Sequence, residues 1–576
     1  MYLVLIETSG NQNYIFSTNK LRENIGASQL TYLAGTEWVI NAVAKVDGNS
    51  RLALWTDKGS KQLRDKLLNL ELNPPIEETD FNIELVLAAS GKAMLLVKDK
   101  DKAKAIIRQV TLQALKEAPG LEISGVIHEF VWDEERSLET AVKAIHSKFE
   151  ANRSQIPSPA MRFLRLPVVE ECASSGLPAA MVERYGENRA ISVTSHQKRE
   201  AKKSGFDRIA ALLNSEYPLA NFANSLQVLD RDLEEDGSSS DRSVEWLGVI
   251  HADGNGLGKI FINFPAHLSK IMPEYTNRDY ANKLREFSLA LDVCTEKAFL
   301  SALAVFQTES EQDTLRIFPL ILGGDDLTVI CDGKFALPFI DRFLIEFEAE
   351  TQRNETISSI AEVALKGDRL SACAGVAIIK PHFPFSVAYE LAESLAKSAK
   401  KVKEIVVTKV EGDRIENIPY PCSALDFHVV YDSSGVELSK IRQRITVDGD
   451  RTKLYCRPYV VTANEDLLAA AGENWVQTHH WNLLQQWVEV LKAKDDEGKP
   501  QLPNSQIYKL RENLLLGKAI TDSYYRLIKK RYQERGITQL EGSNNSLFIV
   551  EPNDNEELPE VYMTGLLDAI EAADFL

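Results

Sequence analysis

One order of strand-like and helix-like segments occurs twice along this chain of 576 residues. In the first copy, apolar strand-like runs lie at residues 1–6, 81–87, 93–97 and 121–131, and the clearest helical stretch lies at 101–118. In the second copy, strands are predicted at 245–251, 315–322, 327–331 and 370–379, and helices at 280–307, 335–350 and 385–402. The hydrophobic periodicity of each segment supports these assignments. The sequence therefore predicts an internal duplication.

The repeated order is strand, helix, strand, strand, helix, strand, which is the order of a ferredoxin-like unit. We therefore expect an α+β chain with two ferredoxin-like domains, because a chain of this length exceeds what one core can hold. The predicted divisions are a first unit at 1–135, an α-rich intermediate segment at 136–243, a second unit at 244–412 and a mainly helical C-terminal domain at 413–576. The intermediate segment ends in an acidic, serine-rich linker at 230–241.

Composition excludes several classes of protein. The net charge of −18 disfavours a free-standing, non-specific nucleic-acid binder, which needs clustered Lys and Arg. No run of 18 apolar residues is present, so no membrane partner or membrane span is expected. The six cysteines are scattered without a C-x-x-C pair, which argues against a zinc finger and a disulfide framework. Together these features favour a cytoplasmic protein.

The strongest chemical signal is a predicted hairpin in the second copy. Two apolar runs flank a tight turn at Gly323-Gly324, followed at once by Asp325 and Asp326. The first strand of the same copy leads to a third carboxylate, Asp253. Carboxylates crowded together repel one another, and hard divalent cations such as Mg²⁺ relieve that repulsion. The sequence therefore predicts a metal site made by Asp253, Asp325 and Asp326.

The first copy lacks these acids. Ser90-Gly91-Lys92 stands where the second copy has Gly-Gly-Asp-Asp, and its first strand leads to Thr8-Ser9-Gly10. We therefore expect only the second copy to bind metal, with the first as a degenerate structural partner.

Two further segments are candidates for binding phosphates. The loop Gly254-Asn255-Gly256-Leu257-Gly258 follows Asp253, and its backbone N–H groups are predicted to meet a triphosphate. Its spacing fits neither a calcium EF-hand loop nor a dinucleotide fingerprint. Lys397 and Lys400 lie three residues apart on one predicted helix and are candidates to neutralise phosphate charge. An ordinary glycine-rich turn and a solvated helix face are the alternative interpretations.

Other nucleotide and hydrolase motifs are missing. No G-x-x-x-x-G-K-[ST] sequence is present, which excludes a Walker-type phosphate loop. No His-Asp dipeptide and no H-E-x-x-H arrangement occurs among the nine histidines. His251 lies two residues before Asp253, where it would either support the metal site or form an ordinary hydrogen bond at the strand end.

At this point the motifs resemble a known family. His251-Ala-Asp-Gly-Asn255, Gly323-Gly-Asp-Asp326 and the helix ending at Lys400 resemble the polymerase/cyclase palm in the large subunit of type III CRISPR effector complexes. The segment 11–28 resembles the first palm of that family, and 172–179 its inter-palm region. Many members carry an HD nuclease domain before the first palm, whereas this chain starts at the palm, so a form without that domain is expected.

The resemblance implies a nucleotidyl cyclase acting in antiviral defence. ATP would be the substrate, two Mg²⁺ or Mn²⁺ ions would be held by the three aspartates, and Gly323 and Gly324 would let a nucleotide approach the backbone closely. Two alternatives stay open: a scaffold subunit that binds guide RNA, target RNA and other effector subunits, and a diguanylate-cyclase-like enzyme that uses GTP. Assembly of the chain with copies of itself is also open.

Overall fold

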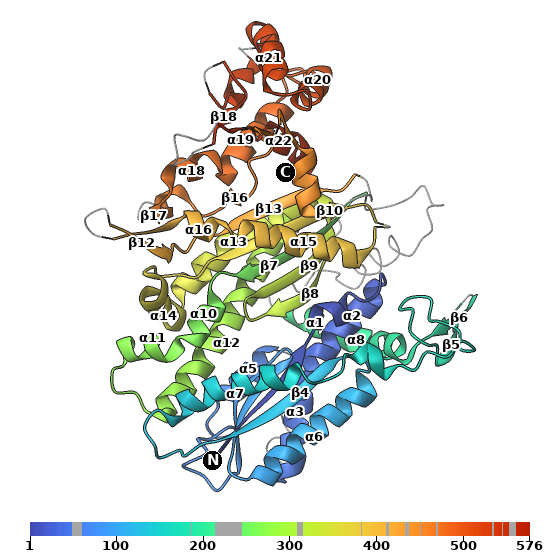
Figure 1. The fold of residues 1–576 in the computed structure, drawn as a ribbon, viewed down its shortest axis with the longest axis vertical. Helices are drawn as coiled ribbons and strands as arrows, with labels where there is room; N and C mark the ends of the chain where they lie inside the picture. The colour runs from blue at the N-terminus through green and yellow to red at the C-terminus, as the bar shows by residue number, and fades with distance from the viewer. Residues whose placement is uncertain are drawn as a thin grey trace.

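The computed structural model shows two sheets one above the other and a third, mainly helical region beyond them (Figure 1). It describes residues 1–48, 60–185, 187–213, 245–307, 315–381, 383–410, 414–431, 437–449, 451–467, 470–532, 535–543, 545–551 and 560–576. The acidic linker predicted at 230–241 lies outside the described residues. Within the described part of the chain, no helix is both long and apolar enough to cross a membrane.

The first sheet has four antiparallel strands in the order β2-β3-β1-β4. These strands are β1 (Tyr2–Ser9), β2 (Ile83–Ala89), β3 (Lys92–Val97) and β4 (Glu122–Glu129). Its helices are α1 (Asn11–Ile15), α2 (Leu21–Gly35), α3 (Glu37–Asp47), α5 (Ser60–Leu68), α6 (Lys100–Glu117) and α7 (Ser137–Arg153). The strand order is that of a ferredoxin-like unit, as the sequence predicts.

The second sheet repeats that order in its inner part and then extends it. Its order is β16-β13-β10-β7-β9-β8, so β10-β7-β9-β8 corresponds to β4-β1-β3-β2 of the first sheet. The strands are β7 (Leu247–Gly254), β8 (Ile317–Gly323), β9 (Asp326–Asp332), β10 (Ala372–Ile379), β13 (Ala424–Val429) and β16 (Tyr459–Val460). The predicted duplication is confirmed. The sequence did not predict that the part after residue 413 adds β13 and β16 to this sheet.

Helices cover the second sheet and bury its central strand completely. They are α10 (Leu257–Ile262), α11 (Phe264–Ile271), α12 (Asn277–Ala302), α13 (Gly333–Arg353), α14 (Glu355–Leu365) and α15 (Phe385–Ala399). All eight residues of β10 are buried, since both α13 and α15 pack on this strand. A strand buried on both faces reads as a continuous apolar run, which explains its sequence. Gly375 permits the closest approach, because a Cβ atom there would lie 2.0 Å from the Ala392 carbonyl oxygen of α15.

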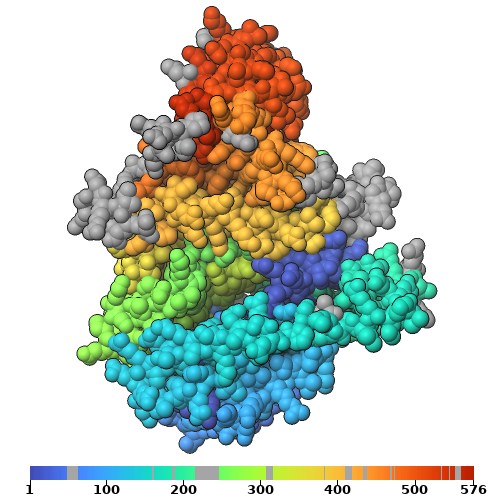
Figure 2. Space-filling view, in the orientation of Figure 1, coloured from blue at the N-terminus to red at the C-terminus, as the bar shows by residue number. Residues whose placement is uncertain are grey.

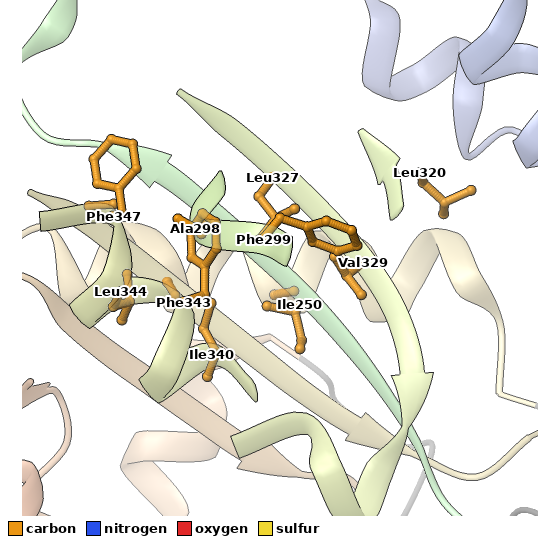
Figure 3. Close-up of a cluster of buried hydrophobic side chains, with 14 of the residues drawn as sticks. Ile250, Ala298, Phe299, Leu320, Leu327, Val329, Ile340, Phe343, Leu344 and Phe347 are labelled. Atoms are coloured by element: carbon orange, nitrogen blue, oxygen red, sulfur yellow. The ribbon is translucent and has the colours of Figure 1, made fainter. Parts of the chain in front are cut away.

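The core of the second unit lies between its sheet and two long helices. Figure 3 shows Phe299 of α12 and Phe343 of α13 beside Ile250 of β7 and Val329 of β9. Helix α12 begins with a capping box in which Thr276 and Asp279 each bond the other's backbone N–H. This start fixes the register of a 26-residue helix that also reaches the first sheet.

Helix α12 connects the two units through buried charges. Arg278 Nη1 lies 2.7 Å from Glu84 Oε1 of β2, and Arg278 Nε lies 2.7 Å from Glu77 Oε1. Arg285 of α12 also donates to Glu84 and to the Leu85 carbonyl. The blue and cyan first unit therefore packs directly beneath the green and yellow second unit (Figure 2).

The intermediate and C-terminal regions complete the described chain. The intermediate region contains a hairpin of β5 (Met181–Tyr185) and β6 (Glu187–Ile191) followed by α8 (Val193–Leu213). The C-terminal helices are α16 (Val402–Ile405), α17 (Leu438–Arg444), α18 (Glu473–Thr478), α19 (Trp481–Lys492), α20 (Asn504–Leu514), α21 (Lys518–Tyr532) and α22 (Leu566–Ala572). Short strands accompany them: β11 (Val407–Val410), β12 (Arg414–Pro419), β14 (Thr446–Val447), β15 (Thr452–Lys453), β17 (Ala470–Ala471), β18 (Ile549–Val550) and β19 (Tyr562–Met563). All six cysteines are free and buried, which confirms that the chain has no disulfide framework.

Candidate active site

The three predicted aspartates meet at one end of the second sheet. Strand β7 pairs with β9 so that Ala252 lies opposite Leu327. In an antiparallel ladder the next residues along, Asp253 and Asp326, are then neighbours across the two strands. The Asp325 side chain also lies close to this end of β7, since a Cβ atom on Gly254 would lie 2.9 Å from Asp325 Cβ. The sheet register alone thus brings together carboxylates that are about seventy residues apart in the sequence.

The hairpin turn lies one residue further along than the sequence analysis placed it. Gly323 pairs with Asp326 in the ladder, so the two turn residues are Gly324 and Asp325 rather than Gly323 and Gly324. Gly324 has a φ of 62°, a value that glycine adopts readily and that the first position of a tight hairpin turn requires. Asp325 therefore lies at the tip itself, and its side chain turns back toward β7.

Burial and the proximity of the other carboxylates raise the pKa values of Asp325 and Asp326. Burial, followed by the negative charge of Asp253, raises the pKa of Asp325 to about 7. Burial together with the charges of Asp253 and Asp325 raises the pKa of Asp326 well above its usual value. The Asp326 Oδ1 atom is buried without a hydrogen-bond partner and lies 3.5 Å from His251 Nδ1. This electrostatic environment favours binding of a positive charge.

His251 and Tyr389 form the buried side of the site. His251 Nδ1 lies 3.2 Å from Thr328 Oγ1, and burial lowers the pKa of the imidazole. The ring of Tyr389, on α15, packs edge-on against His251 and stacks on Phe16 from the end of α1 at a centroid distance of 4.1 Å. Burial and the neighbouring Asp326 raise the pKa of Tyr389. The hydrogen bond expected of His251 at the strand end is therefore present.

The two candidate lysines differ in their surroundings. Lys400, just after α15, bonds through Nζ to Asp253 Oδ2, so its ammonium already neutralises part of the acidic cluster. Lys397 is 68% exposed and pairs with Glu393 one turn earlier, at 2.8 Å. Lys400 lies within the aspartate cluster, whereas Lys397 lies on the helix surface.

The loop 254–258 presents backbone rather than side chains. Asn255 donates from Nδ2 to Ser371 Oγ at 3.0 Å and to the Cys422 carbonyl at 3.2 Å, which ties the loop to the start of β10. Leu257 is buried in the core, so only its backbone is available to a ligand. Gly256 has a φ of 75°, and a Cβ atom on Gly258 would meet nothing within 4 Å. Asn255 and Leu257 thus contribute to the shape of the loop.

Residues that the sequence analysis missed hold the hairpin tip from α12. Asp292 Oδ1 accepts a hydrogen bond from the Gly324 N–H at 2.9 Å, and Thr295 Oγ1 donates to the Gly324 carbonyl. Neither residue belongs to a recognisable motif, and both lie about thirty positions before the turn. Their only sequence signal is the spacing of three, which places both on one face of a helix.

The corresponding positions of the first unit carry a neutral pair. Glu7 lies opposite Lys92, the first residue after the β2–β3 turn, as Asp253 lies opposite Asp326 in the second unit. The Lys92 Nζ to Glu7 Oε2 distance is 3.2 Å. At this position of the first unit, the positive charge of Lys92 therefore compensates the negative charge of Glu7. The first unit does not present a carboxylate pair to a cation.

A cavity of about 560 Å³ opens between the two units and reaches Asp326. Its lining is mostly polar where the end of β1 meets the loop that follows, including Ser9, Asn11 and Gln12. Gly323 and Asp326 line it from the second unit, and Arg153 and Arg208 contribute positive charge. The volume is that of a small-molecule site.

The donor chemistry of the aspartate cluster suits Mg²⁺ or Mn²⁺. These ions take hard oxygen ligands and usually need only one or two carboxylates from the protein. Raised carboxyl pKa values and the unpartnered Asp326 oxygen fit such a role. In the described ranges, no three His, Cys, Asp or Glu side chains are grouped so that they could hold a metal ion, and the Lys400 ammonium contacts Asp253. The metal role of these residues therefore stays a prediction.

Comparison with known proteins identifies the second unit. Residues 246–405 match the family model described as Cas10/Cmr2, second palm domain. This segment is therefore a palm domain of the Cas10/Cmr2 family, as its motifs indicate.

Similar folds also occur among solved structures. One is a chain of type III-B Cmr-beta in the apo state, with 12% identity, coverage of 100% of this chain and 81% of that chain, and a TM-score of 0.47. Another belongs to the Csm1–Csm4 cassette in complex with cA4, with 12% identity, coverage of 99% and 70%, and a TM-score of 0.46. A third is the same cassette in complex with AMPPNP, with 13% identity, coverage of 94% and 64%, and a TM-score of 0.44. No curated protein sequence matches the chain.

Proposed function

We propose that this chain is a nucleotidyltransferase that converts ATP into a cyclic nucleotide or cyclic oligonucleotide and releases pyrophosphate. The observation that carries the proposal is the meeting of Asp253, Asp325 and Asp326 in a palm domain of the Cas10/Cmr2 family. The product would serve as a second messenger in CRISPR-type antiviral defence. An enzyme of this kind would act in the cytoplasm, where its free cysteines stay reduced.

In this proposal the three aspartates hold two Mg²⁺ or Mn²⁺ ions. When bound, such ions would lower the cost of charge on the attacking 3′-hydroxyl and on the leaving pyrophosphate. The carboxylates of Asp325 and Asp326 would then lose their protons at neutral pH, since the cations offset the burial and the repulsion that raise their pKa values.

The remaining groups bind and orient the nucleotides. Lys400 would exchange its contact with Asp253 for a triphosphate oxygen, which places its charge where the leaving group develops negative charge. The backbone of 254–258 would meet phosphate oxygens. The polar cavity beside Asp326 would hold the second nucleotide, so that its hydroxyl faces the aspartate cluster.

Removal of the acidic pair tests the proposal. Asp325→Ala combined with Asp326→Ala is expected to abolish product from α-labelled ATP without loss of the folded state. Asp495→Ala with Asp496→Ala is a matched control, because this adjacent acidic pair is exposed and lies in the C-terminal region. Incubation with all four NTPs and mass spectrometry of the products would identify the base and the ring size. Undiminished synthesis by the first double variant would refute the assignment.

A second function, as a subunit of an RNA-guided effector complex, is favoured by the surface of the C-terminal helices. Large apolar side chains on α20, α21 and the turn between them are exposed, including Leu516 at 61% and Leu527 at 75%. Exposed apolar residues gathered in one region mark a protein interface. Co-purification of the chain with small RNA and other effector subunits would support this function, whereas product synthesis by the isolated chain would favour a free-standing cyclase.

A further inference from the structure

Helix α12 holds the backbone of Gly324 through both its N–H and its carbonyl. Its N–H donates to Asp292 Oδ1 at 2.9 Å, and its carbonyl accepts from Thr295 Oγ1. The next residue is Asp325, so movement of the Gly324 backbone directly moves one carboxylate of the cluster. Position 323 is also close to α12, since a Cβ atom there would lie 3.2 Å from Asp292 Oδ1.

Asp292 is in turn held by an arginine from the other unit. Arg64 Nη1, on α5, lies 2.6 Å from Asp292 Oδ2, and Arg64 Nη2 lies 2.5 Å from Glu296 Oε2, one turn further along α12. The Arg64 side chain is 9% exposed and that of Glu296 is 8% exposed. One guanidinium therefore bridges the buried Glu296 and the half-buried Asp292, and it cannot rotate without breaking both pairs.

The two carboxylate oxygens of Asp292 have different partners. Oδ2 binds the first unit through Arg64, and Oδ1 binds the hairpin tip through Gly324. Because both oxygens belong to one planar carboxylate, fixing the first fixes the direction in which the second accepts its hydrogen bond. Loss of Arg64 would leave Asp292 and Glu296 without the guanidinium that both contact, and their neighbouring negative charges would repel each other.

We propose that Arg64 of the degenerate first unit is a positioning residue for the aspartate cluster of the second unit, acting through Asp292 on the Gly324 peptide. This inference rests on the proposed function for its kinetic consequence only. Its structural consequence, a hairpin tip held by the first unit, is independent of what reaction the site performs. The first unit would thus supply orientation, although it has no acidic pair of its own.

Arg64→Met removes the charge and keeps much of the side-chain length. We expect it to lower kcat for product formation from ATP by on the order of 10²-fold, with KM nearly unchanged, since a small misplacement of a reacting group has this effect. Arg278→Met is the matched control, because Arg278 also joins α12 to the first unit by ion pairs, but its partners are the exposed Glu77 and the buried Glu84. The control should lose stability and keep kcat.

A mutant cycle tests whether Arg64 acts through Asp292. In an Asp292→Asn background, Arg64→Met should lower kcat far less than it does in the wild type, because the link is already broken. Independent effects of the two substitutions would overturn the inference. If Arg64→Met does not fold, Arg64→Lys is used in its place. A single ammonium cannot contact both carboxylates with the geometry of the guanidinium, so we expect a loss of kcat intermediate between wild type and that predicted for Arg64→Met.

Hydrogen exchange of the full-length chain separates this inference from the proposed function. In Arg64→Met, amides at the hairpin tip should exchange on the order of 10-fold faster than in wild type, which corresponds to weakening about one hydrogen bond. Arg278→Met should leave the tip unchanged. If the wild type makes no product, the proposed function fails, and the exchange result still decides the role of Arg64. Equal protection of the tip in both variants would overturn that role.

Discussion

Gly254, the residue after Asp253, can be used to displace the aspartate cluster without removing a charge. A Cβ atom at this position would lie 2.3 Å from Leu257 Cδ1, 2.9 Å from Asp325 Cβ and 3.0 Å from Asp325 Oδ2. Ordinary contact begins at 3.4 Å, so Gly254→Ala forces Asp325 outward. Leu257 cannot absorb the clash alone, because its side chain is buried in the core.

The expected losses differ for stability and for activity. Overpacking of this kind costs about 1–3 kcal/mol of folding free energy. Displacement of Asp325 by a fraction of an ångström should lower product formation from ATP by ~10- to 100-fold. Gly248→Ala, at the other end of the same strand, is the control: its Cβ would lie 2.5 Å from Ala336 Cβ, far along β7 from the acidic cluster.

The assay compares both alanine variants at one temperature well below their unfolding transitions. Thermal unfolding gives the stability of each, and initial rates with α-labelled ATP and Mn²⁺ give the activity. Gly254→Ala should be much slower than Gly248→Ala at similar stability. Equal rates for the two variants would mean that the position of Asp325 does not limit the reaction, and the argument from the aspartate cluster would fail.

Three further predictions follow from contacts around the site and beyond it. Lys400→Met should slow product formation by about 10- to 100-fold, since it removes the ammonium that contacts Asp253; a wild-type rate would contradict its phosphate role. Ser28→Ala should cost about 1–3 kcal/mol in denaturant unfolding, since it leaves the buried Leu320 carbonyl without the hydroxyl that donates to it; an unchanged midpoint would contradict this. Burial raises the pKa of the Cys172 thiol, but hydrogen bonds from serine side chains and backbone outweigh it and lower that pKa from 9.0 to about 6. The unfolded chain then binds more protons between pH 6 and 9, so wild type should gain stability over Cys172→Ala as pH rises through this range, and parallel stability curves would contradict this.

Much of the site could be predicted because its parts have local signals. Short apolar runs indicated the strands of both copies, and the Gly-Gly-Asp-Asp segment indicated the hairpin. Once the strand order is assumed, pairing of β7 with β9 follows, and with it the approach of Asp253 to Asp326. The position of Lys400 at the end of a helix that packs on β7 and β10 also follows from its sequence pattern.

The remaining parts depend on contacts that no local pattern encodes. The sequence analysis placed the hairpin turn one residue too early, at Gly323-Gly324, because two adjacent glycines are typical of a tight turn. In the structure the two turn residues are Gly324 and Asp325. Strand β16 was missed because it has only two residues, and β13 was missed because nothing near it in the sequence shows that it pairs with β10. Arg64 and Asp292 carry no motif, and their meeting depends on how the two units pack. The same holds for Ser28, which contacts β8 from the first unit.

The contacts between the two units explain why a copy without the adjacent acidic pair would be retained. The β8–β9 ladder shifts register between Pro319 and Ile321, which leaves the Leu320 carbonyl outside the strand pairing, and Ser28 of α2 donates to it. Helix α2 lies along β8 at this point (Figure 1).

The first unit thus contacts three elements around the site. It reaches β8 through Ser28, α12 through Arg64 and α15 through Phe16, which stacks on Tyr389. A two-stranded hairpin at the edge of a sheet has little rigidity of its own. Because the cluster needs two carboxylates from the tip of that hairpin and one from β7, its geometry depends on what braces the hairpin. The degenerate unit provides this support through Ser28 and Arg64, so substitution of these two residues should change the orientation of the aspartates before it unfolds the chain.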